Sequence, residues 1–329
     1  MAVLDNREVM KHKIIKILAI FCVAVCTQSC VKDLQEEINE GKWNHERQVV
    51  DIKFENQVGL ATIEAVDNVS GNIDIALNVD AVPDLSNIRL LSLQLSYQAE
   101  SSIKVGESLN FENADRSAKI IVTAKTGENR EYTIRVSEFK EEITGQWTIQ
   151  SLTVWGGTGP EYGGGAVMPL TDKPWCWNEG TGPDAELDNT LTFTLDGVTD
   201  DGNTYGKCVN DAGADGKYFD AIYVGNNPET GENVDVKHFY RQVPEGESIW
   251  KRDYSAGTIS FTDASGNVTT GSFAGAGTED LGWDKTFTVT DNALAFSLNG
   301  TDDWTNIYQD YDKFVKKARK FWVSIKKKQ

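Results

Sequence analysis

Alternation between apolar and polar residues is the sequence feature that most constrains how this chain folds. Beyond residue 48 the chain is built from short runs of period two, such as Ile73-Asp74-Ile75-Ala76-Leu77. Gly, Asn and Asp separate these runs, which is the pattern of strands joined by turns. Long runs with apolar residues at every third or fourth position do not occur there. We therefore predict an all-β fold, with short helices expected only within Asp33–Gln48 and Tyr308–Lys317.

The length of 329 residues favours two domains. The first is predicted to span residues 49–137, because about seven short strands in this stretch fit an immunoglobulin-like (Ig-like) sandwich without the disulfide. A linker near Glu138–Thr144 leads into the second domain, residues 144–329. The strand and turn segments of the first domain occur in the following order: Ile52–Glu55, Asn72–Val79, Pro83–Ser86, Leu93–Ala99, a strand ending at Phe111, Ile120–Ala124, Thr126–Asn129 and Tyr132–Val136.

This order resembles the small Ig-like domains that follow the lipid anchor in surface glycan-binding lipoproteins of the Bacteroidetes type. The resemblance covers about a quarter of the chain, and it implies that residues 49–137 act as a spacer without a ligand site of their own.

Hairpin patterns dominate residues 144–329. Thr258–Asp263 and Val268–Phe273 are predicted to pair, and so are Phe287–Thr290 and Leu294–Leu298 around a turn at Asp291-Asn292-Ala293. The architecture expected from such hairpins is an antiparallel β-barrel or a jelly-roll sandwich.

The two ends of this second domain favour the barrel. It opens with Gly145-Gln146-Trp147, and its last strand is basic, with Arg319, Lys320 and Lys326. A Gly-x-Trp in the first strand with a last-strand cation over its ring resembles the lipocalin-like signature, and such a contact helps to join first strand to last. The motif is short, so the jelly-roll sandwich stays open as the alternative.

The N-terminus carries an export signal. Lys11, Lys13 and Lys16 precede an apolar segment, Ile17–Cys26, that is too short to span a membrane. We read residues 1–29 as a signal peptide, with Met10 as the expected start site. Thr27-Gln28-Ser29-Cys30 resembles a bacterial lipobox, although Thr27 replaces the usual Leu.

That resemblance implies lipidation of Cys30, a lipid-anchored tether over residues 30–48, and an outer-membrane location. The acidic residues after Cys30 are similar to leaders associated with export to the cell exterior. The alternative is a simple secretory signal, with Cys30 an ordinary cysteine.

The charge balance excludes one class of partner. With 32 Lys and Arg against 50 Asp and Glu, the net charge is −18. Such a surface repels phosphate backbones, so nucleic-acid binding is not expected.

Enzyme motifs are largely missing, and we expect neither catalysis nor a cofactor. His238 is the only histidine of the second domain, and no Gly-x-Ser-x-Gly is present. The segment from Glu186 to Leu191 resembles the Glu-x-Asp-x-x-Glu of laminarinase-type glycosidases but lacks the final Glu. The acidic loops Asp196–Asp201 and Asp211–Gly216 lack the spacing of a calcium loop, so we expect no metal.

Two cysteines of the second domain leave a choice open. Cys176 and Cys208 form either a disulfide, as an exported protein allows, or two free buried thiols.

Aromatic residues in Gly- and Asp-rich loops are the candidate ligand contacts, because sugar rings pack their C–H faces on flat apolar surfaces. Trp175-Cys176-Trp177, if extended, points both indoles to one side. Trp147, Trp250 and Trp322 are assigned to the core. The candidate ligand-binding residues are Trp155, Tyr162, Trp175, Trp177, Trp283 and Trp304.

The function predicted from these features is non-catalytic binding of a polysaccharide or oligosaccharide at the cell surface. The anchor implies contact with the membrane, and the resemblance implies an outer-membrane importer complex as a partner. Two alternatives remain: a lipocalin-like binder of a small apolar ligand, and a structural or adhesive envelope protein.

Overall fold

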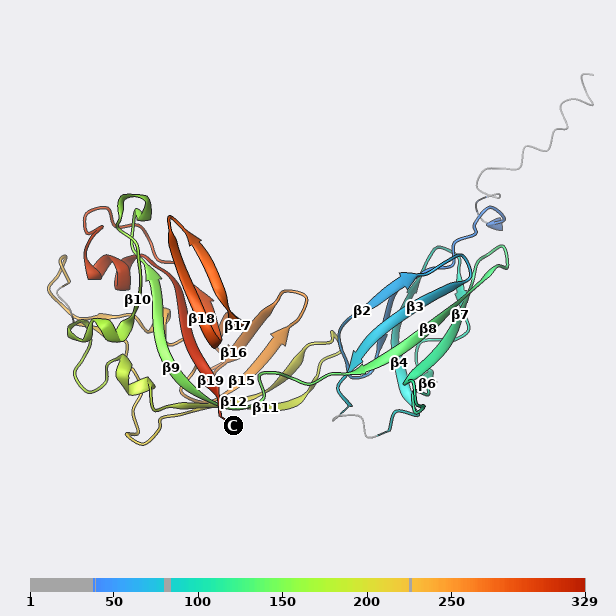
Figure 1. Ribbon diagram of the computed structural model, residues 1–329, viewed down its shortest axis with the longest axis horizontal. Coiled ribbons are helices and arrows are strands. Elements are labelled where there is room, and N and C mark those ends of the chain that lie inside the picture. Colours follow the sequence, from blue (N-terminus) through green and yellow to red (C-terminus); the bar gives the residue numbers. More distant parts are fainter. Residues whose placement is uncertain (1–37, 39, 80–83, 225–226, 329) are drawn as a thin grey trace, which may run out of the picture.

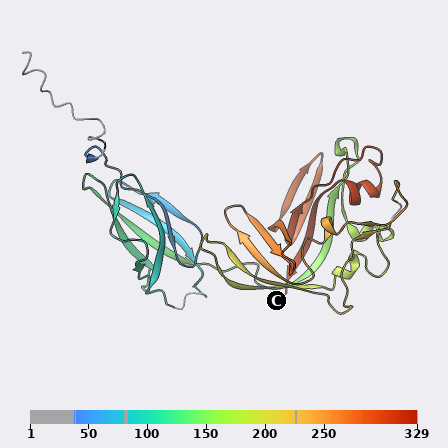
Figure 2. The ribbon, with the colours of Figure 1, turned by 180° about the vertical axis from the view of Figure 1, so that it is seen from behind.

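The structure is a computed structural model that describes residues 38, 40–79, 84–224 and 227–328. The predicted signal peptide and Cys30 lie outside the described residues. Two β domains follow one another along the chain (Figures 1 and 2), and residues 41–48 lead into the first strand without regular structure. The all-β prediction is confirmed.

The N-terminal domain is a sandwich of two sheets. Within it β3 and β8 run parallel, and the other neighbouring strands are antiparallel. One sheet has the order β1 (Val49–Phe54), β4 (Ile88–Leu95), β6 (Ser108–Leu109). The other has the order β2 (Gln57–Ala65), β3 (Ser70–Leu77), β8 (Asn129–Glu138), β7 (Ser117–Thr123), β5 (Glu100–Ser101). Alternate apolar residues of both sheets are buried between them, and Phe54 meets Phe111 edge-on with ring centroids 5.7 Å apart.

The C-terminal domain is a closed antiparallel barrel of eight strands, which decides between the two architectures that the sequence left open. The barrel strands in order are β9 (Gly145–Gly156), β11 (Thr190–Val198), β12 (Thr204–Asp211), β15 (Gly246–Asp253), β16 (Thr258–Thr262), β17 (Val268–Gly282), β18 (Lys285–Ser297) and β19 (Ala318–Lys327). Closure comes from β9, whose first residues pair with β11 while its length pairs with β19. A ninth strand, β10 (Ala166–Pro169), pairs with the end of β9.

A cation of the last strand does cover Trp147, as the Gly-x-Trp pattern predicted, but it is Lys327. Two of the cations named from the sequence cover other rings: Arg319 lies over Trp155, and Lys320 over Trp322. The period of two explains the difference, since Lys327 is the β19 residue registered opposite Trp147.

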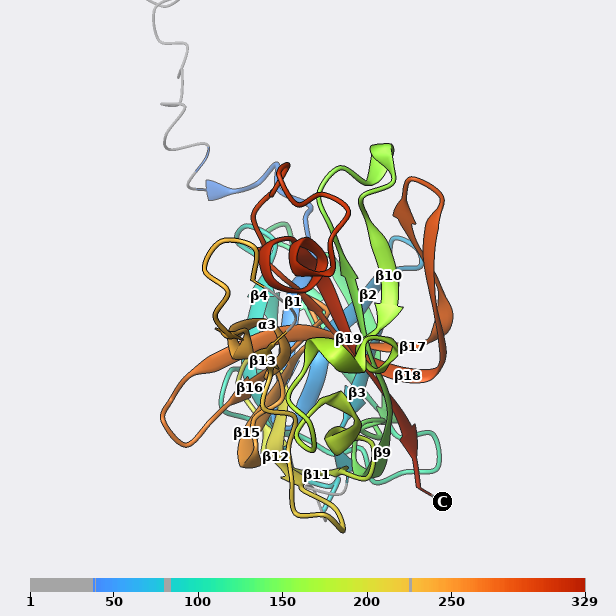
Figure 3. The same cartoon turned by 90° about the vertical axis from the view of Figure 1, so that its left-hand side faces the viewer.

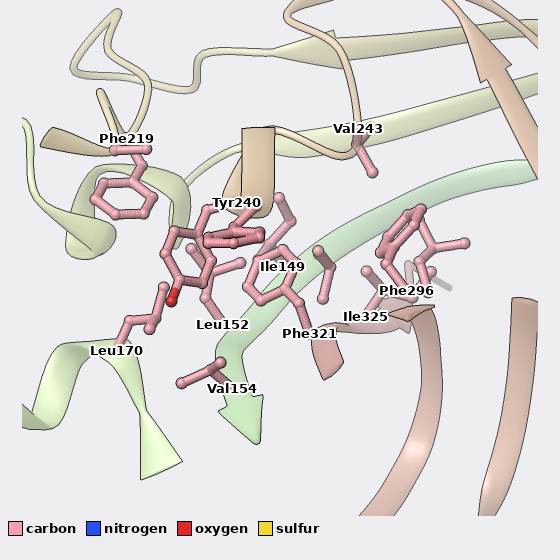
Figure 4. Close-up of a cluster of buried hydrophobic side chains, with 14 of the residues drawn as sticks. Ile149, Leu152, Val154, Leu170, Phe219, Tyr240, Val243, Phe296, Phe321 and Ile325 are labelled. Atoms are coloured by element: carbon pink, nitrogen blue, oxygen red, sulfur yellow. The ribbon is translucent and has the colours of Figure 1, made fainter. Parts of the chain in front are cut away.

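Large side chains fill the inside of the barrel. Phe296, Phe321 and Ile325 point inward from β18 and β19, as Figure 4 shows. Tyr240 and Phe219 pack against the same cluster, and the Tyr240 hydroxyl donates a hydrogen bond to the Phe314 carbonyl oxygen at 2.8 Å. The enclosed space between this cluster and Glu186 amounts to about 10 Å³, which is room for about one water molecule. The barrel therefore has no room here for a lipid-sized ligand, which removes the main support for the apolar-ligand alternative.

Short helices and a two-stranded ribbon surround one end of the barrel (Figure 3). The ribbon pairs β13 (Ile222–Tyr223) with β14 (Val234–Asp235). The helices are α3 (Lys237–Tyr240), the 3-10 turns η2 (Pro160–Tyr162), η3 (Leu170–Asp172), η4 (Pro174–Cys176) and η5 (Pro183–Glu186), and the π-helix η6 (Asp312–Lys316). The last of these lies within the predicted helical segment Tyr308–Lys317. None of the helices in the described part of the chain is long and apolar enough to cross a membrane.

The predicted turn at Asp291-Asn292-Ala293 is wrong, because these residues lie inside β18. The register between β17 and β18 shifts next to Asn292, so Asp and Asn mark a β-bulge there instead of a chain reversal. The reversal is at Trp283-Asp284, where both residues have positive φ, 50° and 57°.

The linker between the domains ends in a buried carboxylate. The Glu141 side chain is fully buried and accepts hydrogen bonds from Arg252 at 2.7 Å, Thr204 at 2.6 Å and Tyr254 at 2.5 Å. Phe139 packs edge-on against Tyr254, with centroids 5.7 Å apart. The linker residues are thus part of the barrel's own packing.

Candidate functional site

The six aromatic residues proposed as ligand contacts divide into two buried and four exposed side chains. Trp155 and Trp177 are only 5% and 3% exposed, so the prediction that they contact a ligand is wrong. The four others, Tyr162, Trp175, Trp283 and Trp304, are each more than half exposed. They lie in the loops and hairpin tips of the C-terminal domain.

Trp177 is buried because its segment is not extended. Pro174 starts the 3-10 turn η4, and this turn sends Trp177 inward while Trp175 stays outside. The Trp177 ring meets Phe219 edge-on at a centroid distance of 5.0 Å, and its Nε1 donates to the Leu170 carbonyl oxygen at 3.1 Å. The expectation that both indoles share one side fails for this reason.

Trp155 is buried because β9 continues through it. The residue pairs with Val167 of β10 and with Lys320 of β19, so it lies in a strand and not in the Gly-rich loop that follows. Its ring joins a small core on the outer face of the barrel with Trp322 and Ala293. Trp147, Trp250 and Trp322 are buried, which confirms their assignment to the core.

Trp175 stands at the rim of the largest cleft found in the described residues, with a volume of about 540 Å³. Its side chain is 64% exposed, and the ammonium of Lys173 lies 5.2 Å from the ring centroid. The loops before β11 and before β13 form the walls. We call this the Trp175 cleft, and its polar lining residues are Asn178, Glu179, Asp184, Asp215 and Lys217.

Hydrogen bonds at the base of the Trp175 cleft hold its loops in place. Asp220 accepts from the Asn178 amide and the Thr181 hydroxyl, both at 2.7 Å. On the opposite wall, Asp188 accepts from the backbone N–H of Asp215 at 3.3 Å. The Lys217 ammonium donates to the Gly180 carbonyl oxygen at 3.0 Å. The cleft is therefore shaped before any ligand arrives, which lowers the entropy cost of binding.

Glu186, the first acid of the incomplete glycosidase pattern, has a structural role. It is 4% exposed and accepts hydrogen bonds from Arg241 at 2.6 Å and from the Phe219 N–H at 3.0 Å. Among the described residues, no three His, Cys, Asp or Glu side chains come together as a metal-binding group.

The proposed disulfide is absent, and Cys176 and Cys208 are free buried thiols. Cys176 lies in η4, whereas Cys208 points into the barrel from β12. Burial raises the pKa of Cys176 to about 11 and that of Cys208 to about 12, so both are protonated at neutral pH.

Sequence reasoning missed Tyr308, which is as exposed as Tyr162 and lies near it. Its position in the same Asp- and Asn-rich segment as Trp304 was the available signal. Comparison of the chain with protein-family models and with curated proteins found no match.

Proposed function

We propose that this chain is a non-catalytic, lipid-anchored protein of the cell surface that binds polysaccharide in the Trp175 cleft. The observation that carries the proposal is an indole left 64% exposed at the rim of a preformed cleft lined by carboxylates and an amide. An exposed indole is costly to leave in water, and a sugar ring can cover it with its C–H face.

The lining favours a neutral glycan. Glu179, Asp184 and Asp215 outnumber Lys217 in the cleft, so uronate or sulfate groups would meet like charge. Carboxylates and the Asn178 amide can instead accept hydrogen bonds from hydroxyl groups of the sugar. Binding of this kind needs no cofactor.

The arrangement of the two domains supports a spacer role. Residues 41–48 enter the sandwich at its end farthest from the barrel (Figure 1), so an anchor at Cys30 would hold the barrel away from the membrane. Presentation of captured polysaccharide to an outer-membrane importer belongs to the same proposal.

Affinity gel electrophoresis of the mature chain tests the binding. We expect retardation by at least one neutral polymer among soluble β-glucan, mannan, xylan and starch. Trp175→Ala should abolish the retardation, since it removes the exposed ring. Trp43→Ala is the matched control, because Trp43 is 55% exposed but precedes the other domain. The proposal fails if wild type runs unchanged in every polymer, or if Trp175→Ala is retarded as strongly as wild type.

Two further measurements test the remaining parts. Release of new reducing ends from the retained polymer would contradict the non-catalytic assignment. Metabolic labelling with a fatty acid should mark wild type but not Cys30→Ala, and protease treatment of intact cells should digest the barrel. Unlabelled wild type would contradict the lipid anchor.

A further inference from the structure

A second exposed aromatic surface lies on the same end of the barrel as the Trp175 cleft. It consists of Tyr162, Trp304 and Tyr308, each more than half exposed, and we call it the Tyr162 surface. The ring centroids of Tyr162 and Trp304 are 6.1 Å apart, and the Tyr308 hydroxyl donates to the Tyr162 carbonyl oxygen at 3.4 Å. Its residues come from η2 and from the segment before η6, which both lie around the barrel end that faces the viewer in Figure 3.

Buried hydrogen bonds fix the Tyr162 surface from below. The Asp312 side chain is fully buried and accepts from the N–H and the hydroxyl of Thr158, at 2.7 and 2.8 Å. The Thr158 hydroxyl in turn accepts from the Asp303 N–H at 2.7 Å. Gly159, with φ 57°, lies so close beneath Trp304 that an added Cβ would come within 3.0 Å of the ring. The three rings are therefore held ready and lose little freedom on binding.

Lys173 connects the two surfaces. Its ammonium lies 5.2 Å from the Trp175 ring centroid and 3.2 Å from Asp310 Oδ2. Asp310 follows Tyr308 by two positions, so the side chains run from Trp175 through Lys173 and Asp310 to Tyr308. Polar groups that can bond to hydroxyls thus alternate with exposed rings along this path.

We propose that one polysaccharide chain occupies the Trp175 cleft and the Tyr162 surface together, so that the protein selects long chains over short oligosaccharides. This inference rests on the function proposed above. Asp302, Asp303 and Glu161 stand beside the second surface, which disfavours an anionic membrane or nucleic acid as its occupant. Continuity with the cleft favours a further stretch of the same neutral glycan.

Titration calorimetry with a ladder of oligosaccharides tests the inference. The probes are the disaccharide to the octasaccharide of the polymer retained in the gel, together with the polymer itself. Two linked contacts raise affinity steeply once a chain reaches both, so wild-type affinity should rise by about tenfold or more beyond a threshold length. Trp304→Ala and Tyr308→Ala should remove that rise and leave the affinity for short oligosaccharides unchanged. Trp175→Ala should weaken every member of the ladder, and Trp43→Ala none.

The outcomes separate the two proposals. If Trp175→Ala loses binding while both Tyr162-surface variants hold the polymer as tightly as wild type, the inference is overturned and the Trp175 cleft stands as the whole site. If wild type binds no member of the ladder and no polymer, the proposed function itself is wrong. Circular dichroism of the variants checks that each is folded, as the exposure of the substituted side chains leads us to expect.

Discussion

The ammonium of Lys327, near the end of the last strand, lies 5.3 Å from the centroid of the Trp147 ring in the first strand of the barrel. The same ammonium donates to the Glu142 carbonyl oxygen at 3.1 Å, and Trp147 Nε1 donates to the Ile143 carbonyl oxygen at 2.7 Å. The linker, the first strand and the last strand are thus joined at one point. Trp147 closes the barrel there and also fixes the chain that enters from the N-terminal domain.

Removal of this cation should loosen the closure of the barrel. Lys327→Met keeps the length of the side chain but loses its charge, and we expect the free energy of unfolding to fall by about 0.5–1 kcal/mol. Urea denaturation measures the change. Lys328→Met is the control, because only the main chain of Lys328 contacts β9, through its N–H. A double-mutant cycle with Trp147→Leu should assign most of the loss to the pair, and a coupling energy of zero would refute the contact.

Loss of the Glu141 carboxylate should destabilise the barrel far more. Glu141→Ala leaves Arg252 without its buried partner, and breaking such a pair costs about 3–5 kcal/mol. Glu138→Ala is the matched control, because Glu138 forms surface ion pairs with Arg116 and Lys140 at 3.8 Å. Surface pairs of this kind contribute about 1 kcal/mol or less. Equal losses in the two variants would show that burial of Glu141 does not matter in solution.

The pH dependence of stability should report on the same residue. Burial favours the neutral acid, but hydrogen bonds from Thr204 and Tyr254 and the charge of Arg252 outweigh it, so the pKa of Glu141 is lowered below 4.5. A carboxyl whose pKa is lower in the folded state contributes stability above its unfolded pKa and loses it as the pH falls through the folded value. The difference in unfolding free energy between wild type and Glu141→Gln should therefore be constant near neutral pH and shrink below about pH 4. A difference that grows on acidification would give the opposite sign.

The two thiols should stay unreactive until the barrel opens. Cys176 and Cys208 are buried and protonated at neutral pH, so a thiol reagent should not modify a chain that begins after Cys30. In guanidinium without reductant, both thiols should react, and Cys176→Ser should leave one. If no thiol appears in denaturant, the two cysteines are bridged after all.

The strands were the part of the fold most accessible from the sequence, because a period of two reports directly on a half-buried strand. The run Tyr132–Val136 lies within β8, and Gly145-Gln146-Trp147 does begin the strand that closes the barrel. Asp291-Asn292-Ala293 misled because Asp and Asn favour turns and bulges alike, and only the partner strand decides between them.

Exposure of the aromatic residues was far less accessible, because it depends on side chains distant in sequence. Trp175 and Trp177 differ by two positions, yet only Trp177 is covered, by Phe219, Tyr223 and Tyr240. Pro174 was a local sign that the segment turns instead of extending. The sequence has no comparable sign for the rings that cover Trp177, so its burial could be learned only from the fold.

The turn that joins β17 to β18 carries backbone strain at an exposed tryptophan. Trp283 and Asp284 both have positive φ, a conformation that hairpin turns usually fill with Asn-Gly. The double substitution Trp283→Asn with Asp284→Gly should therefore raise the free energy of unfolding by about 1 kcal/mol. Urea denaturation measures it, with Trp283→Phe as the control that keeps the strain. Unchanged or lower stability would mean that the indole packs in solution and offsets its strain. The same variant decides whether Trp283 contacts glycan: because the residue does not line the Trp175 cleft, the cleft proposal requires retardation in the affinity gel to persist.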